Sequence, residues 1–286
     1  MAIHFREVSH HFQAFEEGPY QAIRDISFSL QEKDEFVALI GQTGSGKSTL
    51  AQHMNALLFP SIGEVEIFGK KVTKKRNKKI NYNDIRRDVG LVFQFPEYQL
   101  FEETVEKDIM FGPRNFGMEI EEAKNKAAEA IKLVGLDETY LRRNPLNLSG
   151  GEKKRVSIAG ILAIEPKILV FDEPTSGLDP FGKHQLMTLF ENIRKKTGKS
   201  IVMITHDMDL VYAHCTRALV LKNGKLVYDG KTDALFNHPN LHEFFLDKPQ
   251  TMQILEYIKT KYDLTLDSMK KTPKEAATAI EAAMKP

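Results

Sequence analysis

Residues 41–48, Gly-Gln-Thr-Gly-Ser-Gly-Lys-Ser, have the composition and spacing of a loop that binds phosphate groups. Glycine lets the backbone come close to an anion, and the amides at the start of a following helix attract phosphate oxygens. Lys47 adds a positive charge for the terminal phosphates, and the Ser48 hydroxyl can complete the coordination shell of Mg²⁺. The loop predicts a site for ATP and Mg²⁺, with these nucleotide contacts: Gly41, Gln42, Thr43, Gly44, Ser45, Gly46, Lys47, Ser48 and Thr49.

Two carboxylates follow the apolar run 168–171. Asp172 is expected to hold Mg²⁺, partly through water, because this cation keeps much of its hydration shell. Glu173 is expected to face the terminal phosphate and to orient or deprotonate the attacking water. Paired carboxylates at a strand end can also be a solvated cap. The sequence that follows, Pro-Thr-Ser-Gly-Leu-Asp-Pro over residues 174–180, favours the catalytic interpretation.

A helix start of unusual composition lies at Leu-Ser-Gly-Gly-Glu, residues 148–152. Ser149 and Glu152 form the capping-box pattern, and a well-capped helix would by itself explain them. Gly150 and Gly151 also expose the amides of a positive helix end, which suits a phosphate arriving from another molecule. Both interpretations are compatible. Glu152 would keep the cap but place a negative charge near that phosphate.

Apolar runs define the elements that must position these residues. Residues 36–40, 168–171 and 201–205 are uniform enough for strands buried on both faces, and each run ends in polar groups. In an open parallel sheet, ligands bind beyond the carboxyl ends of the strands, so these endings should face one nucleotide. The period-2 pattern of 26–30 predicts a half-buried strand. Helices are expected over 48–58 and 119–134, and a hairpin around Asn223-Gly224.

Composition sets the remaining limits. The chain has 286 residues, 42% of them hydrophobic, and a net charge of +1, so nucleic acid is not expected as a partner. Cys215 is the single cysteine and should be a packed apolar residue. The longest uncharged apolar stretch, 156–164, is half the length that spans a bilayer, so separate membrane subunits would be needed for transport.

The pattern of the sequence changes from about residue 240 onward. Its apolar residues between 241 and 258 suggest a helix pair, and Thr272-Pro273 with Glu275 opens a last helix with a capping box. A small helical appendage that packs on the main domain or on a partner is expected.

Residues 70–79 contain seven basic residues and no acidic one. Such a run is usually a solvated loop. The functional alternative is contact with anionic lipid at a membrane surface.

Taken together, the motifs between Phe12 and His206 resemble a complete ATP-binding cassette (ABC) ATPase. The resemblance implies an α/β fold with a mostly parallel sheet, an N-terminal antiparallel part and an inserted helical subdomain at roughly 95–165. The cassette would span residues 1–240, and residues 241–286 would form a C-terminal helical extension. In this family the Ser149-Gly150-Gly151 turn of one subunit closes over the ATP held by another, so a dimer is implied.

The same resemblance implies roles for four further residues. Gln94 would contact Mg²⁺ or the water and signal to a membrane partner, and His206 would hold the γ-phosphate and Glu173. Asp179 would belong to a loop that faces the dimer partner. Phe12 falls where the family stacks an aromatic ring on adenine, although a core phenylalanine would fit the pattern nearly as well; His11 and Tyr20 are substitutes.

Two details resemble the ATPase subunits of energy-coupling factor (ECF) transporters: the Phe-Pro-Glu-Tyr-Gln-Leu-Phe run 95–101 and the helix sequence 155–163. The Phe-rich, extended opening of the chain resembles more specifically the second of the two ATPases. The implied partners are a second homologous ATPase in a heterodimer, a transmembrane coupling protein and a small membrane subunit that captures a vitamin or metal ion. The protein would lie on the cytoplasmic side of the cell membrane. Residues 96–101 would line the groove for the coupling protein, with Glu97, Glu102 and Glu103 facing its arginines.

Three alternatives were weighed. A cobalt or nickel importer ATPase is a close relative. A soluble ABC ATPase of DNA repair would need room for a long coiled coil, which the 102 residues from Lys47 to Ser149 do not provide. A P-loop kinase would not need the Ser149-Gly150-Gly151 turn.

Overall fold

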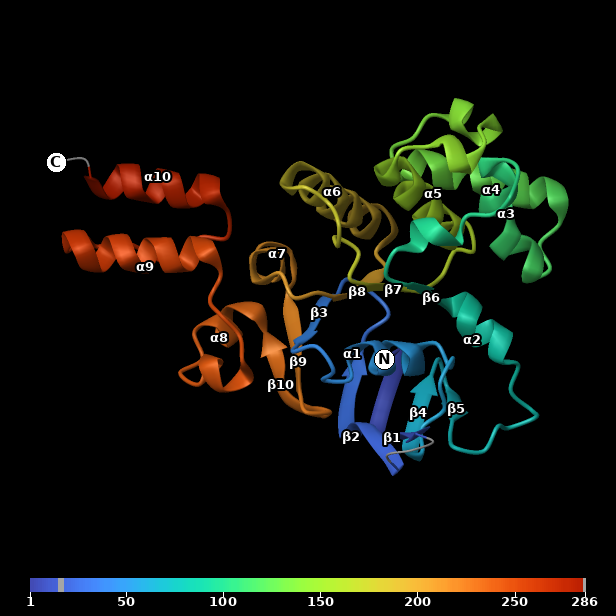
Figure 1. Ribbon diagram of the computed structural model, residues 1–286, viewed down its shortest axis with the longest axis horizontal. Helices are drawn as coiled ribbons and strands as arrows, with labels where there is room; N and C mark the ends of the chain where they lie inside the picture. The colour runs from blue at the N-terminus through green and yellow to red at the C-terminus, as the bar shows by residue number, and fades with distance from the viewer. Residues whose placement is uncertain (15–17, 285–286) are drawn as a thin grey trace.

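Two β-sheets form the centre of the structure, a computed structural model that describes residues 1–14 and 18–284 (Figure 1). The first sheet is antiparallel, with the strand order β2-β1-β4-β5. Its strands are β1 (Ile3–Ala14), β2 (Gly18–Leu30), β4 (Ile62–Ile67) and β5 (Lys70–Val72).

The second sheet has the order β10-β9-β3-β8-β7-β6 and is parallel except for its edge strand β10. Its strands are β3 (Phe36–Gly41), β6 (Val89–Val92), β7 (Ile168–Asp172), β8 (Ser200–Ile204), β9 (Arg217–Lys222) and β10 (Lys225–Lys231). The predicted hairpin is confirmed, with Asn223 and Gly224 at φ 49° and 76° in the turn between β9 and β10. Both residues tolerate this left-handed region, as such a tight turn requires.

The uniformly apolar strands of the second sheet serve two separate cores. Val37 and Leu39 pack toward the first sheet, whereas Ala38 and Ile40 pack toward the helices on the opposite face. Because successive side chains of a strand point to opposite faces, a strand buried on both sides must be apolar throughout. The sequence prediction of buried strands is thus confirmed, as is the α/β fold with its N-terminal antiparallel part.

Two groups of helices lie at opposite ends of the molecule, with the other helices between them (Figure 1). One group contains α3, α4 and α5, which contact one another. The other is the pair α9 and α10 beyond β10. The helices are α1 (Lys47–Met54), α2 (Tyr82–Asp88), α3 (Val105–Asn115), α4 (Ile120–Leu133), α5 (Gly150–Leu162), α6 (Pro180–Thr197), α7 (Met208–His214), α8 (Thr232–Phe236), α9 (Gln250–Tyr262) and α10 (Pro273–Met284). Short 3₁₀ helices are η1 (Pro96–Gln99), η2 (Glu138–Arg142), η3 (Pro145–Asn147) and η4 (Leu241–Phe244).

Two helix predictions were wrong in extent. The helix predicted over 48–58 ends at Met54, because Ala56 has a φ of 54° that no helix accommodates. The helix pair predicted between 241 and 258 is a 3₁₀ turn followed by α9, because Phe245 at φ 57° and Pro249 interrupt it. Helix α9 contacts α10 instead.

Both predicted capping boxes are present, at Ser149–Glu152 and at Thr272–Glu275. Cys215 is buried, as expected of a packed apolar residue. Within residues 1–14 and 18–284, no helix combines the length and the apolar character that crossing a bilayer requires. The division into a 1–240 cassette and a 241–286 extension remains a prediction.

Candidate functional site

The glycine loop connects β3 to α1 in a conformation that side chains would block. Gly41 has a φ of 143°, and a Cβ there would lie 2.1 Å from the Leu221 carbonyl oxygen. Gly46 has a φ of 100°, and its Cβ would lie 2.5 Å from the Ala22 carbonyl oxygen. The loop is therefore pressed against β9 and β2, which only glycine permits at these two positions.

The Lys47 side chain forms hydrogen bonds to the start of its own loop. Its ammonium group donates to the carbonyl oxygens of Gly41 and Gln42, both at 2.8 Å. Burial lowers the pKa of Lys47, while the nearby carboxylates of Glu173 and Asp172 act in the opposite direction. A partly desolvated cation at the mouth of an amide-rich loop is suited to bind phosphate.

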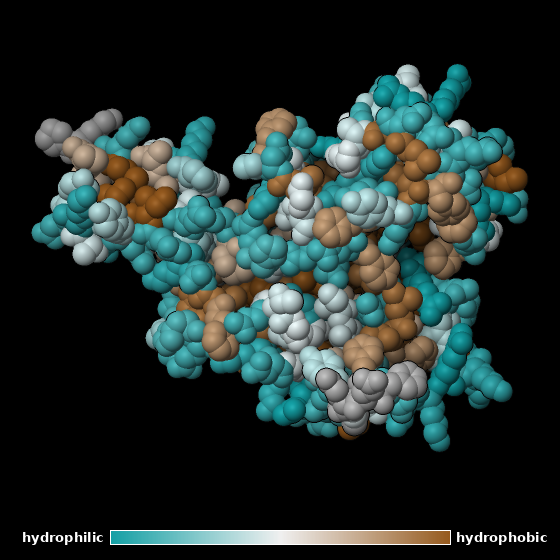
Figure 2. All heavy atoms as spheres, viewed as in Figure 1, coloured by the Kyte–Doolittle hydropathy of each residue, from teal (hydrophilic) through white to brown (hydrophobic). Residues whose placement is uncertain are grey.

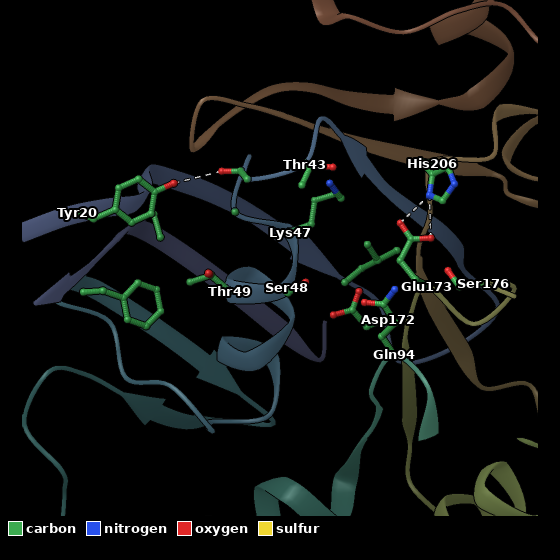
Figure 3. A pocket seen from close by; sticks show the side chains of 15 residues that line it. Tyr20, Thr43, Lys47, Ser48, Thr49, Gln94, Asp172, Glu173, Ser176 and His206 are labelled. Carbon is green, nitrogen blue, oxygen red and sulfur yellow. Dashed lines mark hydrogen bonds and ion pairs between the residues drawn. The ribbon is translucent and has the colours of Figure 1, made fainter. Parts of the chain in front are cut away.

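A cleft of about 450 Å³ lies beside the loop, between the two sheets (Figure 3). It brings together most of the predicted site residues from six separate segments of the chain. The lining comprises Phe12, Tyr20, Ala22, Thr43, Gly44, Gly46, Lys47, Ser48, Thr49, Gln94, Asp172, Glu173, Ser176, Ile204 and His206. Gly41 and Gln42 line an adjoining hollow together with Lys47, Glu173 and His206, and Ser45 is buried within the loop.

Three side chains whose oxygen atoms can bind a metal ion meet at the inner end of the cleft. Asp172 ends β7, Ser48 is in the first turn of α1, and Gln94 follows β6. Burial raises the pKa of Asp172, against the effects of the Ser48 hydroxyl and of Lys47. A desolvated carboxylate beside a hydroxyl and an amide oxygen is a ligand set that fits Mg²⁺.

Glu173 and His206 face each other at the same end of the cleft (Figure 3). His206 Nδ1 donates to Glu173 Oε1 at 3.1 Å and lies 3.0 Å from Oε2. Oε2 is buried and has no aligned hydrogen-bond donor among the described residues. The backbone of Glu173 has a φ of 49°, a strained conformation held by a bond from its amide to the Ile204 carbonyl at 3.0 Å. This carboxylate is thus fixed in place beside the His206 imidazole.

Two aromatic residues stand at the outer end of the cleft. Phe12 on β1 and Tyr20 on β2 are register partners, and both rings are partly exposed. The Tyr20 hydroxyl donates to the Gly44 carbonyl at 3.3 Å, whereas Phe12 packs edge-on against His10. Phe12 is therefore not a core residue, and either ring can offer a face to a planar base.

The Ser149-Gly150-Gly151 turn and Asp179 do not line this cleft. The turn begins α5 and is exposed, and a Cβ at either glycine would meet nothing within 4 Å. Asp179 caps α6 by accepting from the Gly182 amide at 2.7 Å. In one chain these predicted nucleotide contacts lie apart from the phosphate loop.

Glu152 controls the local hydrogen bonding of this turn. Its Oε2 accepts from the Ser149 amide at 2.8 Å and from the Ser149 hydroxyl at 2.7 Å, and its Oε1 accepts from Tyr140 at 2.6 Å. These hydrogen bonds lower the pKa of Glu152 to about 2, and the bond from Tyr140 has the largest effect. The residue is therefore a fixed negative charge at the helix start.

Sequence analysis missed Lys154 and Tyr140. Lys154 is only 3% exposed and donates to the carbonyl oxygens of Pro174 and Ser176, in the loop after Glu173. A lysine spaced five residues after the Ser149 cap lies on the inner face of α5, which helical periodicity could have indicated. Tyr140 lies on η2, and no sequence signal links it to Glu152.

An apolar groove opens between β6, η1, α3 and α5, with a volume of about 150 Å³. Pro96, Leu100 and Phe101 line it as expected, and Phe101 packs edge-on against Phe111. The acid in the groove is Asp108, not a glutamate of the predicted set. Burial raises the pKa of Asp108, which accepts from the amides of Phe101 and Glu102.

The three glutamates that were predicted to face a partner do not line the groove. Glu97 is largely buried, with its carboxylate 3.9 Å from Lys154. Glu103 forms an ion pair with Lys107 on the surface, and Glu102 is half-buried. The prediction that Glu97 faces a partner is therefore wrong, because α5 supplies a cation from within the same chain.

Residues 23–176 match the ABC transporter family. The chain is 43% identical over 267 residues to the energy-coupling factor transporter ATP-binding protein EcfA2 of Bacillus cereus, covering 93% of this chain and 90% of the relative. It is 45% identical over 262 residues to EcfA2 of Enterococcus faecalis, covering 91% and 90% of the two chains.

Solved structures agree with these relatives. CbiO1 of Clostridium perfringens, described as part of the ABC transporter complex CbiONQ, superimposes with a TM-score of 0.74 at 30% identity, covering 92% of this chain and 96% of that one. A dimeric ATP-binding cassette in a post-hydrolysis state with ADP and Pi bound gives a TM-score of 0.70 at 30% identity, covering 80% and 98%.

Proposed function

The chain belongs to the ABC transporter family and, within it, to the energy-coupling factor ATP-binding proteins, and from this premise we propose that its cleft binds and hydrolyses ATP to power import. The observation that carries the proposal is the pairing of Glu173 with His206 at 3.1 Å in the cleft that holds Lys47. A carboxylate that is fixed by a neighbouring imidazole, opposite a phosphate-binding loop, is an arrangement for activating water.

Each residue has a defined task. Lys47 and the loop amides hold the phosphates, and Asp172, Ser48 and Gln94 supply oxygen ligands for Mg²⁺. Bound Mg²⁺ neutralises phosphate charge in the transition state. The Glu173 carboxylate accepts the proton of the attacking water, and the His206 imidazole keeps the carboxylate oriented. The ring of Phe12, or that of Tyr20, stacks on adenine.

Complete sites require a second subunit. Ser149, Gly150, Gly151 and Asp179 lie outside the cleft of their own chain, while Gly150 and Gly151 at the start of α5 are exposed. A helix start with bare amides would bind the γ-phosphate held by a partner. The dimeric state of a similar cassette supports this arrangement. The partner proposed here is a second, homologous ATPase.

The groove at η1 is the proposed contact with the transmembrane coupling protein. Its apolar walls suit an inserted helix, and Asp108 offers a carboxylate to a basic residue of that helix. The protein would then lie at the cytoplasmic face of the cell membrane as a peripheral subunit. A small membrane subunit would capture the substrate, a vitamin or a metal ion. The second candidate is the ATPase of a cobalt or nickel importer, the close relative named in the sequence analysis.

The substitution Glu173→Gln tests the catalytic assignment. It should leave ATP binding intact and slow hydrolysis by at least ~10²-fold, the lower range for a general base. Glu281→Gln on the exposed face of α10 is the matched control and should change neither quantity. Turnover within a few-fold of the wild type in Glu173→Gln would refute the role of Glu173.

Native purification in mild detergent tests the partners. A second cassette ATPase and a polytopic membrane protein should copurify with this chain. Recovery of the chain alone, with its ATPase activity intact and vigorous as a monomer, would contradict the shared-site arrangement.

A further inference from the structure

Residues 70–79, here called the basic segment, carry seven positive charges and no negative charge in a chain whose net charge is only +1. The segment comprises β5 and the turn that leads to α2. None of its residues lines the nucleotide cleft or the groove at η1. The function proposed above therefore leaves this concentration of charge unexplained.

The backbone of the basic segment is held in a defined shape. Val72 is fully buried, and the Asn77 amide donates to the hydroxyl of the buried Tyr82 at 2.9 Å. The guanidinium of Arg76 lies 5.1 Å from the centre of the same ring. Asn77 also accepts from the Lys79 amide at 3.0 Å, which closes the turn. The segment is a built surface feature that presents its charges from fixed positions.

Four lysines of the segment point their charge at solvent. Lys70 is paired with Asp84 and Lys71 with Glu64. Lys74, Lys75, Lys78 and Lys79 are exposed, and no carboxylate within residues 1–14 and 18–284 forms an ion pair with them. Clustering four like charges without counter-charges costs free energy through mutual repulsion, which an anionic surface would remove.

The basic segment lies at the same end of the molecule as the groove proposed to receive the membrane subunit, which indicates the membrane as the anionic surface. Helix α2 connects the basic segment directly to β6, and Leu91 and Val92 of β6 line the groove proposed to receive the membrane subunit. In Figure 1 the segment, α2 and α3 lie at the same end of the molecule, and the α9–α10 pair lies at the other. Hydrophilic side chains project from this corner in Figure 2, beside the apolar surface between the two halves of the molecule.

We propose that the basic segment binds anionic phospholipid headgroups of the membrane next to the groove, an inference that rests on the proposed function for its orientation. Its free charges are all lysines, which act as point charges and suit a fluid array of phosphates better than a fixed partner. The one arginine is stacked on Tyr82. No aromatic residue is interleaved in the segment to stack on the bases of single-stranded RNA.

Vesicle sedimentation with the full-length chain tests the proposal. A basic residue close to an anionic membrane contributes a factor of about 5 in binding, so four lysines should contribute on the order of 100-fold or more. The chain should sediment with vesicles of phosphatidylglycerol and phosphatidylcholine at low salt, lose this binding at high salt, and stay in solution with phosphatidylcholine alone.

The decisive comparison is between two variants with the same change in net charge. The test variant is Lys74→Gln, Lys75→Gln, Lys78→Gln and Lys79→Gln, and it should lose roughly several hundred-fold in binding to the anionic vesicles. The control variant carries the same substitution at exposed lysines remote from the segment, Lys225, Lys259, Lys261 and Lys274. The control should bind within a few-fold of the wild type.

Several results would overturn the proposal: equal losses in both variants, binding to phosphatidylcholine alone, or tighter binding of a single-stranded RNA oligonucleotide than of anionic vesicles through the same lysines. Lys47→Ala separates this proposal from the ATPase assignment, because it should weaken ATP binding and leave vesicle binding unchanged. A Glu173-dependent ATPase that ignores anionic vesicles would refute the lipid contact alone.

Discussion

The buried ammonium group of Lys154 donates a hydrogen bond to the Ser176 carbonyl oxygen at 3.0 Å, joining α5 to the loop that follows Glu173. The same group donates to the Pro174 carbonyl at 3.1 Å and lies 3.9 Å from Glu97 on η1. One side chain thus connects the helix that begins at Ser149, the loop after Glu173 and the turn that lines the apolar groove. If one of these three segments moved alone, its contact with the Lys154 ammonium group would be replaced by a contact with water.

Replacing Lys154 tests that connection. Lys154→Met should destabilise the protein by about 3 kcal/mol, because two carbonyl oxygens lose their donor and Glu97 loses its cation. Urea unfolding measures the change. The neighbouring Lys153→Met, at a half-buried position of α5 without these bonds, should cost under about 1 kcal/mol. Equal effects of the two substitutions would contradict the connecting role of Lys154.

Two of the three glycines of the phosphate loop, Gly44 and Gly46, differ in what surrounds them. A Cβ at Gly46 would lie 2.5 Å from the Ala22 carbonyl oxygen, whereas one at Gly44, with φ 79°, would meet nothing within 4 Å. Gly46→Ala should therefore abolish ATP binding by displacing the loop, and Gly44→Ala should show only the cost of its positive φ, about 1 kcal/mol. Titration with a fluorescent ATP analogue and thermal unfolding of both variants check this. Similar ATP affinities in the two variants would count against the loop geometry.

The ring that stacks on adenine can be identified by comparing Phe12 with Tyr20. Loss of a stacking ring should weaken ATP binding by about 1–3 kcal/mol, roughly 5- to 150-fold. If the ring is Phe12, then Phe12→Ala should show this loss and Tyr20→Ala should not. Tyr20→Phe removes the bond to Gly44 while keeping the ring, so it separates stacking from support of the loop. Isothermal titration with ATP and with a triphosphate lacking the base completes the test. An equal effect on both ligands would exclude stacking.

Buried His53 should make stability depend on mildly acidic pH. Its Nδ1 donates to the Thr49 carbonyl at 2.7 Å, and burial lowers its pKa from 6.5 to about 4. The unfolded chain takes up the proton first as pH falls, so stability contributed by this group is present above about pH 6.5 and is lost progressively toward pH 4. The loss attributable to His53 should be about 3 kcal/mol.

Urea unfolding at a series of pH values measures that loss. In His53→Gln, the decline in stability between about pH 7 and pH 4 should be shallower by roughly this amount. His184→Gln, at an exposed position of α6, is the control and should keep the wild-type slope. Parallel curves for wild type and His53→Gln would mean that another group, such as the neighbouring His10, dominates the acid dependence.

The sequence by itself determined those features that depend on interactions between residues close together in the chain. The spacing of the glycines, Lys47 and Ser48 fixes a strand–loop–helix unit, since the backbone at Gly41 and Gly46 leaves no room for a side chain. The apolar runs fixed the buried strands and therefore the edge of the sheet at which Asp172, Glu173 and His206 meet. The capping boxes at Ser149 and Thr272 were likewise set within four residues.

Tertiary structure decided what depends on contacts between distant segments. The hydrogen bonds of Lys154 to the loop 174–176 and of Tyr140 to Glu152 join elements whose separation no periodicity encodes. The end of α1 at Met54 and the break after Phe245 were decided by backbone turns that helical propensity does not register. The sequence by itself therefore determined the chemistry of the nucleotide cleft. Only the packed chain decided that Asp108 rather than Glu97 faces the groove, because burial and ion pairing depend on neighbours from elsewhere in the fold.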